Sequence, residues 1–243
     1  MRPILAAESL FVSWQRGKWV LQDVSFTLSA GELIGIIGPS GCGKSTLCLA
    51  LAGIIPRQLP GQVAGKILLA GQNLDELSQP EIASRLGIVF QDPQSQLFLP
   101  RARNELAFGP ENLCLPREEI AARVQRIAEE IGCLDMLAAS PNELSGGQQQ
   151  LIALAAVLAL EPKVLILDEV TAQLDPRTCQ RLQGIIRDLR RRGVALLMVE
   201  HNLQQLAAAD HILVLREGRL EEAAAGDLEG EEGLSRVYGG GRD

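Results

Sequence analysis

GPSGCGKS, residues 38–45, is the stretch that decides the fold. It follows the apolar run LIGII (33–37) and leads into a helical pattern over residues 44–53, a context typical of a phosphate-binding loop. The glycines allow main-chain N–H groups to surround phosphate oxygens, and the start of the helix adds a positive dipole. Lys44 would contact the outer phosphates, and the Ser45 hydroxyl would bind Mg²⁺. The sequence therefore predicts a nucleotide site where a strand ends.

Apolar runs on the C-terminal side of this loop alternate with helical patterns. VLIL (164–167) follows a helix predicted over 146–160, and VALLMV (194–199) follows one predicted over 177–192. Such alternation indicates a parallel sheet that is covered on both faces. Further strand patterns, separated by turn residues, occupy residues 4–12, 19–28, 63–70 and 87–90. The fold class is therefore predicted to be α/β.

Residues 93–143 have a different character, because prolines divide them into short pieces. Within them, residues 118–131 have apolar side chains at three- and four-residue spacing, which predicts an amphipathic helix. We expect a mostly helical insert. Residues 223–243 are acidic and rich in glycine, and we expect them to form a mobile tail.

Composition excludes several classes of function. The net charge of −7 disfavours a nucleic-acid partner. The five cysteines include no CxxC pair, so neither a zinc site nor a disulfide framework is expected, and a reducing compartment is the simplest one. The longest apolar run, residues 151–160, is about half of what a membrane span needs. We therefore expect a chain that does not cross a bilayer by itself.

Two carboxylates, Asp168 and Glu169, directly follow the apolar run VLIL. Sheets of this kind bind ligands beyond the carboxyl ends of their strands. Asp168 is predicted to hold Mg²⁺ through water, and Glu169 to polarise the attacking water. Together with the phosphate-binding loop, the pair indicates a nucleotide triphosphatase.

The stretch LSGGQQQ (144–150) allows two interpretations. Its serine and glycines begin a helical pattern, so the N–H groups and the helix dipole could bind an anion without a lysine. Alternatively, Ser145 caps the helix, and Gln148 completes a capping box three residues later. Taken as seven isolated residues, the stretch favours the cap.

The order of these motifs, with the helical insert between them, resembles the ATP-binding cassette (ABC) ATPases over nearly the whole chain. The resemblance implies a P-loop NTPase of the ABC ATPase type: a mixed-sheet core with an N-terminal antiparallel β subdomain and an α-helical subdomain. It implies one domain over 1–243, with residues 1–92 and 144–222 as the core and 93–143 as the helical subdomain. ATP and Mg²⁺ are the implied cofactors. Two subunits, identical or related, would pair head to tail, so that the LSGGQ loop covers ATP held by the partner.

The resemblance also assigns residues. It implies catalytic roles for Glu169, His201 and Lys44, and metal contacts for Ser45, Gln91 and Asp168. His201, in MVEHNL, matches the switch histidine; Asp175, in QLDP, matches the aspartate that faces the partner subunit. The residues expected to contact nucleotide are Trp14, Gly38, Pro39, Ser40, Gly41, Cys42, Gly43, Lys44, Ser45, Thr46, Gln91, Ser145, Gly146, Gly147, Gln148 and Asp175.

Two of these assignments leave alternatives open. Trp14 matches the aromatic residue that stacks on adenine, with Trp19 as the rival, and either could be a core residue. Cys42 lies near Lys44 and a helix start, and both would favour its thiolate form. We therefore expect that alkylation of Cys42 blocks ATPase activity, unless the residue only fills space.

Finer similarity lies in QDPQSQLF (91–98), ELAFGPENL (105–113) and LPREEI (115–120), which resemble energy-coupling factor (ECF) ATPases. These power uptake of vitamins and of nickel or cobalt ions. The resemblance implies a peripheral subunit at the cytoplasmic face of the membrane. Its partners would be a second ABC ATPase subunit, a transmembrane coupling protein and a substrate-binding membrane component. The run AFGPENL (107–113) is interpreted as the packing and coupling surface of the insert.

Several positions depart from the family pattern. Residues 100–103 (PRAR) stand where the family usually has a β-branched and acidic stretch, which bears on the identity of the partner. Leu151 replaces an arginine, Val170 replaces a proline and Gln173 replaces a glycine, and these changes could slow turnover or suit a particular partner. The alternative functions are a soluble ABC ATPase that acts on DNA or ribosomes, which the acidic charge disfavours, and a phosphoryl-transferring kinase. A kinase would leave LSGGQ and His201 unexplained. The sequence does not identify the transported substrate.

Overall fold

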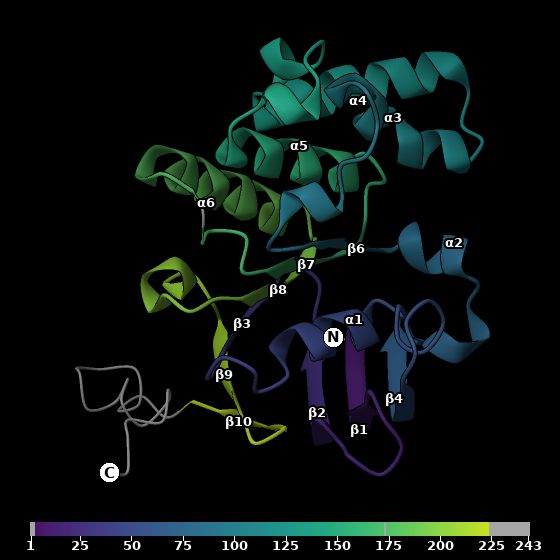
Figure 1. Ribbon diagram of the computed structural model, residues 1–243, viewed down its shortest axis with the longest axis vertical. Helices are drawn as coiled ribbons and strands as arrows, with labels where there is room; N and C mark the ends of the chain where they lie inside the picture. Colours follow the sequence, from purple (N-terminus) through teal and green to yellow (C-terminus); the bar gives the residue numbers. More distant parts are fainter. Residues whose placement is uncertain (1–2, 173, 224–243) are drawn as a thin grey trace.

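The computed structural model describes residues 3–172 and 174–223, which form two sheets with helices packed against them, most of the helices lying towards one end of the molecule (Figure 1). The antiparallel sheet has the order β2 (Leu21–Leu28), β1 (Leu5–Ser13), β4 (Gln62–Leu69) and β5 (Gln72–Asn73). The larger sheet has the order β10 (Arg219–Glu222), β9 (His211–Arg216), β3 (Leu33–Ile37), β8 (Ala195–Val199), β7 (Val164–Asp168) and β6 (Leu86–Val89). Strands β9 to β6 are parallel, and β10 pairs antiparallel at the edge, so this sheet is mixed.

The central strands are buried on both faces, as their continuous apolar runs predict. On β7, Leu165 and Leu167 pack on one side with α5 (Gly146–Leu158) and α6 (Pro176–Arg191). Val164 and Ile166 pack on the other side with α1 (Lys44–Leu51) and the antiparallel sheet. Because side chains alternate along a strand, one run of apolar residues serves two cores.

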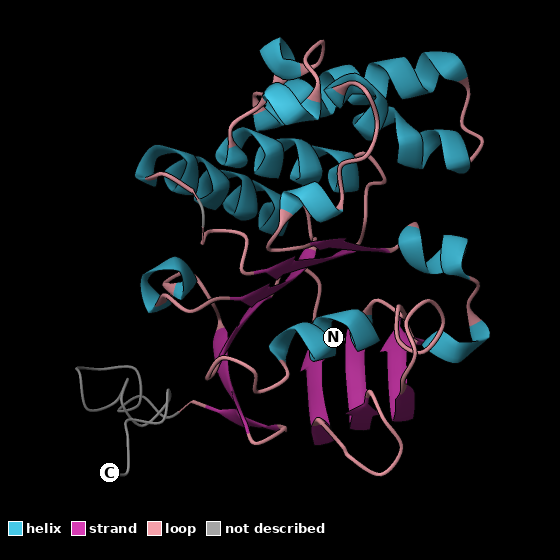
Figure 2. Cartoon of the chain, in the orientation of Figure 1, coloured by secondary structure: helices cyan, strands magenta, loops and turns pink. Residues whose placement is uncertain are grey.

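The part between residues 93 and 143 is helical and lies at one end of the molecule (Figure 2). Its longer helices are α3 (Ala102–Asn112) and α4 (Arg117–Ile131), which pack against α5. Shorter helices are η2 (Pro93–Ser95), η3 (Leu134–Met136) and η4 (Pro141–Glu143); elsewhere lie η1 (Leu74–Glu76), α2 (Gln79–Ala83) and η5 (Leu203–Leu206). The boundaries proposed for core and helical subdomain remain a prediction.

The helix α3 continues through Pro110, where the sequence suggested a break. A residue with a Cβ is disfavoured in helical conformation before a proline, but here that residue is Gly109. Gly109 also allows close packing, since a Cβ there would lie 2.7 Å from the Leu160 side chain. The segment AFGPENL is therefore the second half of a helix that packs closely on its neighbour.

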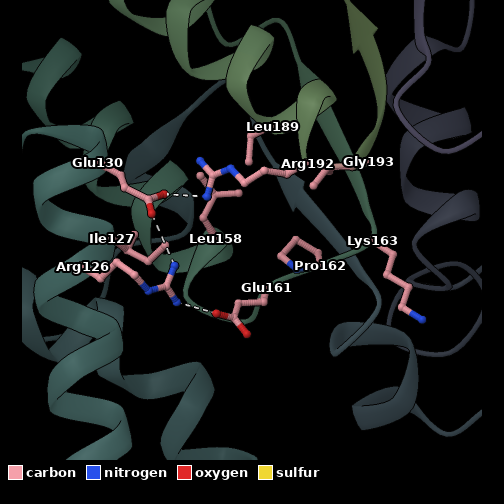
Figure 3. A pocket seen from close by; sticks show the side chains of 11 residues that line it. Arg126, Ile127, Glu130, Leu158, Glu161, Pro162, Lys163, Leu189, Arg192 and Gly193 are labelled. Carbon is pink, nitrogen blue, oxygen red and sulfur yellow. Dashed lines mark hydrogen bonds and ion pairs between the residues drawn. The ribbon is translucent and has the colours of Figure 1, made fainter.

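A cavity of about 370 Å³ lies beside α4 and the amino-terminal ends of β7 and β8 (Figure 3). Four of its charged side chains form ion pairs: Arg192 contacts Glu130 of α4 at 2.9 Å, and Arg126 of α4 contacts Glu161. Partly exposed pairs of this kind contribute roughly 0–1 kcal/mol each. We infer that these ion pairs, called here the α4 ion-pair cluster, connect α4 to the core.

Within residues 3–172 and 174–223, no helix has the length and apolar character needed to cross a membrane. The predicted mobile tail, apart from Ala223, lies outside the described residues. The N–H group of Ala223 donates to the carbonyl of Ile212 at 2.8 Å.

Candidate active site

The phosphate-binding loop connects β3 to α1, in the strand–loop–helix arrangement that its motif predicts. Gly38, Gly41 and Gly43 have φ angles of 155°, 76° and 111°, a region that strains residues with a Cβ. At Gly38 a Cβ would also lie 2.2 Å from the carbonyl oxygen of Leu215. Gly43 is the N-cap of α1 and offers no capping side chain. The first turn of α1 thus lacks side-chain capping, as suits a helix start that binds an anion.

Lys44 is buried, with 5% of its surface exposed, and its ammonium group is held within the loop. It donates to the carbonyl of Gly38 at 2.9 Å and to that of Pro39 at 3.1 Å. Its Nζ lies 3.6 Å from Oε1 of Glu169. These contacts aim a fixed positive charge at the space between the loop and the end of β7.

Glu169 follows the last residue of β7 and has a φ of 52°, the left-handed region that favours glycine. A strained backbone of this kind costs about 1–3 kcal/mol and persists only where surrounding contacts enforce it. The N–H group of Glu169 donates to the carbonyl of Val199 at 2.9 Å. Its Oε1 lies 2.7 Å from Nε2 of His201. The turn thus brings the carboxylate between Lys44 and His201.

Asp168, the last residue of β7, has the features of a metal ligand. It is 4% exposed, and its Oδ1 has no hydrogen-bond partner. Burial raises the pKa of this carboxyl, while a hydrogen bond from the Ser45 side chain opposes the shift. Among the residues that the structure describes, no three His, Cys, Asp or Glu side chains form a metal cluster. One carboxylate, one hydroxyl and water or phosphate oxygens suit Mg²⁺, which keeps several waters, so the residues fit this ion.

A cavity of about 660 Å³ brings together residues from five parts of the chain. Its lining comprises Trp14, Val20, Ser40, Gly41, Gly43, Lys44, Ser45, Thr46, Gln91, Glu169, Ala172 and His201. Trp14 is 40% exposed and donates from Nε1 to the Thr46 hydroxyl at 3.2 Å. Trp19 instead packs edge-to-face on Phe11, with ring centroids 5.7 Å apart. Between the two tryptophans, Trp14 is the one that lines this cavity.

Neighbouring glutamines fix the backbone beside Gln91. The Phe90 N–H group donates to Oε1 of Gln96 at 2.8 Å, and Nε2 of Gln150 donates to the Phe90 carbonyl at 3.1 Å. Gln150 lies in the first turns of α5 and is 5% exposed. The Gln91 segment is therefore attached to the helix that begins with the LSGGQ stretch.

The LSGGQ residues line a separate cavity of about 930 Å³, together with Asp175 and the start of α6. Both halves of the capping box form: Gln148 accepts from the Ser145 N–H at 2.9 Å, and the Ser145 hydroxyl accepts from the Gln148 N–H at 3.4 Å. Asp175 caps α6 by accepting from the Thr178 hydroxyl and from the N–H groups of Arg177 and Thr178. These bonds hold the pKa of the Asp175 carboxyl below its usual range. The two cavities share no lining residue.

This geometry agrees with the comparisons to known proteins. The family model described as "ABC transporter" matches residues 21–172. The chain belongs to the ABC transporter family. A protein of Pyrococcus abyssi, named as an ABC transporter ATP-binding protein, is 40% identical over 89% of this chain and 79% of its own length.

The names of two further relatives specify the type of transporter. The energy-coupling factor transporter ATP-binding protein EcfA of Methanosarcina acetivorans is 39% identical, over 89% of this chain and 78% of its own. The structure of cbiO1 from Clostridium perfringens, described as part of the ABC transporter complex cbiONQ, superposes with a TM-score of 0.80. It is 32% identical and covers 91% of this chain and 88% of its own. The chain spans only 39% and 32% of two longer relatives from Methanosarcina.

The predicted fold class and the ATPase activity are therefore confirmed. The chain is an ABC ATPase subunit of a transporter. These similarities do not favour the alternative function, an ABC ATPase that acts on DNA or ribosomes. The individual roles assigned to the site residues remain predictions.

The prediction that Cys42 favours its thiolate form is wrong. Burial raises the pKa of this thiol, and this effect exceeds the opposing ones of Lys44 and of nearby N–H groups. Nearness to a cation and a helix start suggested the reverse, but desolvation disfavours the charged form more strongly. Cys42 in this ABC ATPase is thus a half-buried neutral thiol at neutral pH.

Two departures from the family pattern meet in the core. Leu151 and Val170 are 4% and 3% exposed, and both line one small apolar cavity with Leu154, Leu167 and Leu174. An arginine at position 151 would bring a charge to this apolar site or to the adjoining LSGGQ cavity, which Leu151 also lines, whereas leucine fills the apolar site without needing a polar partner. The two replacements are therefore compatible with each other. Gln173 lies outside the described residues.

One pair beside Glu169 and His201 was not predicted from the sequence. Glu200, directly before His201, is 2% exposed and bonds to Thr171, two residues after Glu169. The signal was an acidic residue at the end of the apolar run VALLMV, where a buried charge requires a partner.

Proposed function

We propose that this chain is the ATP-binding and ATP-hydrolysing subunit of an energy-coupling factor importer. ATP would close a dimer and hydrolysis would reopen it, driving uptake of a vitamin or a transition-metal ion. The similarity to EcfA and to cbiO1 supports this type of transporter. The observation that carries the proposal is the cavity that combines a phosphate-binding loop, a lysine, a glutamate and a histidine.

In the proposed mechanism, the loop from Gly38 to Thr46 binds the phosphates of ATP and Trp14 stacks on adenine. Lys44 neutralises charge between the outer phosphates. Glu169 takes a proton from the attacking water, and His201, 2.7 Å away, orients Glu169 and contacts the γ-phosphate. Asp168, Ser45 and Gln91 would hold Mg²⁺, which supplies positive charge at the phosphate oxygens.

The second cavity suits the role of completing a site on another subunit. Ser145, Gly146, Gly147 and Gln148 would contact the γ-phosphate of ATP held by the partner, and Asp175 would face that partner. In a head-to-tail dimer with twofold symmetry, each loop then meets the other subunit's site. The partner is a second copy or a related chain.

The first prediction tests the nucleotide site. Lys44→Ala is expected to lower kcat/KM for ATP at least about 10²-fold, because the outer phosphates lose their buried charge-assisted partner. Phosphate release and binding of a fluorescent ATP analogue to the purified chain would measure this. Lys163→Ala is the control, because Lys163 does not line the nucleotide cavity. Equal activity of the Lys44 variant and wild type would contradict the proposed ATP site.

An exposed aromatic pair supports a docking surface for a membrane partner. Phe98, in the segment after Gln91, and Phe108, on α3, are 66% and 42% exposed and pack edge-to-face, with centroids 5.2 Å apart. Glu105, 5% exposed, accepts from the Leu99 N–H group and fixes this segment. Exposed aromatics next to the Gln91 segment would receive a helix of the transmembrane coupling protein, at the cytoplasmic face.

The second prediction concerns this surface. Replacing both Phe98 and Phe108 with serine is expected to release most of the chain from native membranes, since two anchors of a helix–groove contact are lost. Fractionation of cells that express the tagged chain would measure the membrane-bound share. Trp19→Ala, which removes an exposed ring that packs on Phe11 instead, serves as the control. Unchanged membrane binding of the double variant would exclude this surface.

A further inference from the structure

One buried side chain joins two segments of the active site. The carboxylate of Glu200 accepts from the Thr171 N–H group at 3.3 Å through Oε1 and from the Thr171 hydroxyl at 2.8 Å through Oε2. Both oxygens therefore bind the same residue. The N–H group of Glu200 donates to the carbonyl of Ile36 at 3.1 Å, on the strand that leads into the phosphate-binding loop.

The position of this contact relates it to catalysis. Thr171 lies two residues after Glu169, and Glu200 directly precedes His201. The backbone at Glu169 is left-handed, so the turn must be held by its surroundings. Within the turn, the Ala172 N–H group donates to the Glu169 carbonyl at 3.2 Å. The Glu200–Thr171 contact holds the far side of the same turn.

We propose that Glu200 is a positioning residue for ATP hydrolysis: by binding Thr171, it holds the turn at Glu169 and sets the spacing between Glu169 and His201. The inference rests on the proposed catalytic roles of those two residues. Glu200 itself does not line the nucleotide cavity, so it acts through Thr171.

A buried carboxylate beside two other carboxylates is a poor choice for a residue whose only role is to stabilise the fold. The pKa of the Glu200 carboxyl is raised to about 7, mainly by burial and also by the carboxylates of Glu169 and Asp168, while the hydrogen bonds from Thr171 oppose the shift. A neutral side chain would avoid the cost of burying a charge beside two others. Perturbed carboxyls of this kind cluster at functional sites.

The test compares Glu200→Gln, Thr171→Val and the double variant with wild type. Gln cannot accept through both atoms, and Val lacks the hydroxyl. Each single variant is expected to lower kcat about 10-fold or more through misplacement of Glu169, while KM for ATP stays within about twofold. The double variant should be no slower than the slower single one, because both changes break one contact. Thr171→Ser should retain wild-type kcat.

Asp210→Asn is the matched control. Asp210 also accepts from a main-chain N–H group, that of Leu33, but at the amino-terminal edge of the sheet. Its kcat should equal that of wild type even if its melting temperature falls. Thr171→Val and Thr171→Ser keep the test available should Glu200→Gln not fold.

The pH profile gives an independent measurement. In wild type, kcat is expected to fall as pH drops through about 7, because protonation removes an acceptor oxygen from Thr171. The other ionisable side chains that face this region are unchanged in Glu200→Gln; they are Lys44, Asp168, Glu169, Cys179 and His201. If the fall in kcat below about pH 7 is lost in Glu200→Gln, the pH dependence is therefore assigned to Glu200.

The outcomes separate this inference from the proposed function. An inactive wild-type chain, assayed with its partners, would argue against the proposed ATPase mechanism itself. An active wild type whose Glu200 and Thr171 variants keep full kcat and the same pH profile would overturn the positioning role. Lower melting temperatures alone would assign the pair to stability.

Discussion

Replacing Glu169 with glutamine is expected to lower kcat for ATP hydrolysis about 10³-fold, because the amide cannot accept a proton from the attacking water. ATP binding should persist or become tighter. Glu169 lies 3.6 Å from Nζ of Lys44, so its negative charge faces the space proposed for the triphosphate. Glutamine keeps the shape of the side chain and removes this repulsion. Phosphate release and equilibrium binding of ATP would measure the two effects.

The same variant should accumulate as a dimer. Since hydrolysis is the step proposed to reopen the closed pair, a chain that binds ATP without turnover should elute at twice the monomer mass with ATP and Mg²⁺, and as a monomer without them. Glu161→Gln is the control and should retain activity, because Glu161 is an exposed carboxylate of the α4 ion-pair cluster. A Glu169→Gln chain that hydrolyses ATP at the wild-type rate would remove this residue from the mechanism.

Local patterns predicted most of the fold. The helices starting at Lys44, Gly146 and Pro176 begin at or within one residue of the expected positions, because glycine, Ser145 and Asp175 mark their N-caps. The buried strands β7 and β8 were equally clear from their apolar runs. Lys44 lies on one of these elements, Glu169 directly follows β7 and His201 lies two residues after β8, so the candidate site could be assembled from spacing and resemblance.

The remaining features depend on contacts between distant residues. Strand β9 is held by pairing with β3, which lies far away in the sequence. The course of α3 through Pro110 depends on Gly109 and on the side chain of Leu160. The raised pKa of Cys42 follows from burial, which no local pattern reports. The Glu200–Thr171 contact likewise needs two loops to meet.

Replacing Ser145 with arginine is expected to abolish hydrolysis while the isolated chain binds ATP as well as wild type. The cavity of Ser145 shares no lining residue with that of Lys44, so a large side chain in one leaves the other unchanged. In a dimer, the arginine would instead obstruct the surface proposed to meet the partner's γ-phosphate. Nucleotide binding by the monomer and phosphate release at dimer-forming concentrations would measure both effects. Weakening of monomer binding to the level of Lys44→Ala would contradict the trans assignment.

Mixing the two inactive variants makes the strongest test. A mixed dimer of Ser145→Arg and Lys44→Ala contains one site built from two intact halves and one built from two damaged halves. With random pairing, half of the dimers are mixed and half of their sites are intact, so activity should recover to about a quarter of wild type if sites act independently. If each chain completed its own site, the mixture would stay inactive, because neither variant has an undamaged site to contribute. Recovery by mixing thus distinguishes a site shared between subunits from one contained within a chain.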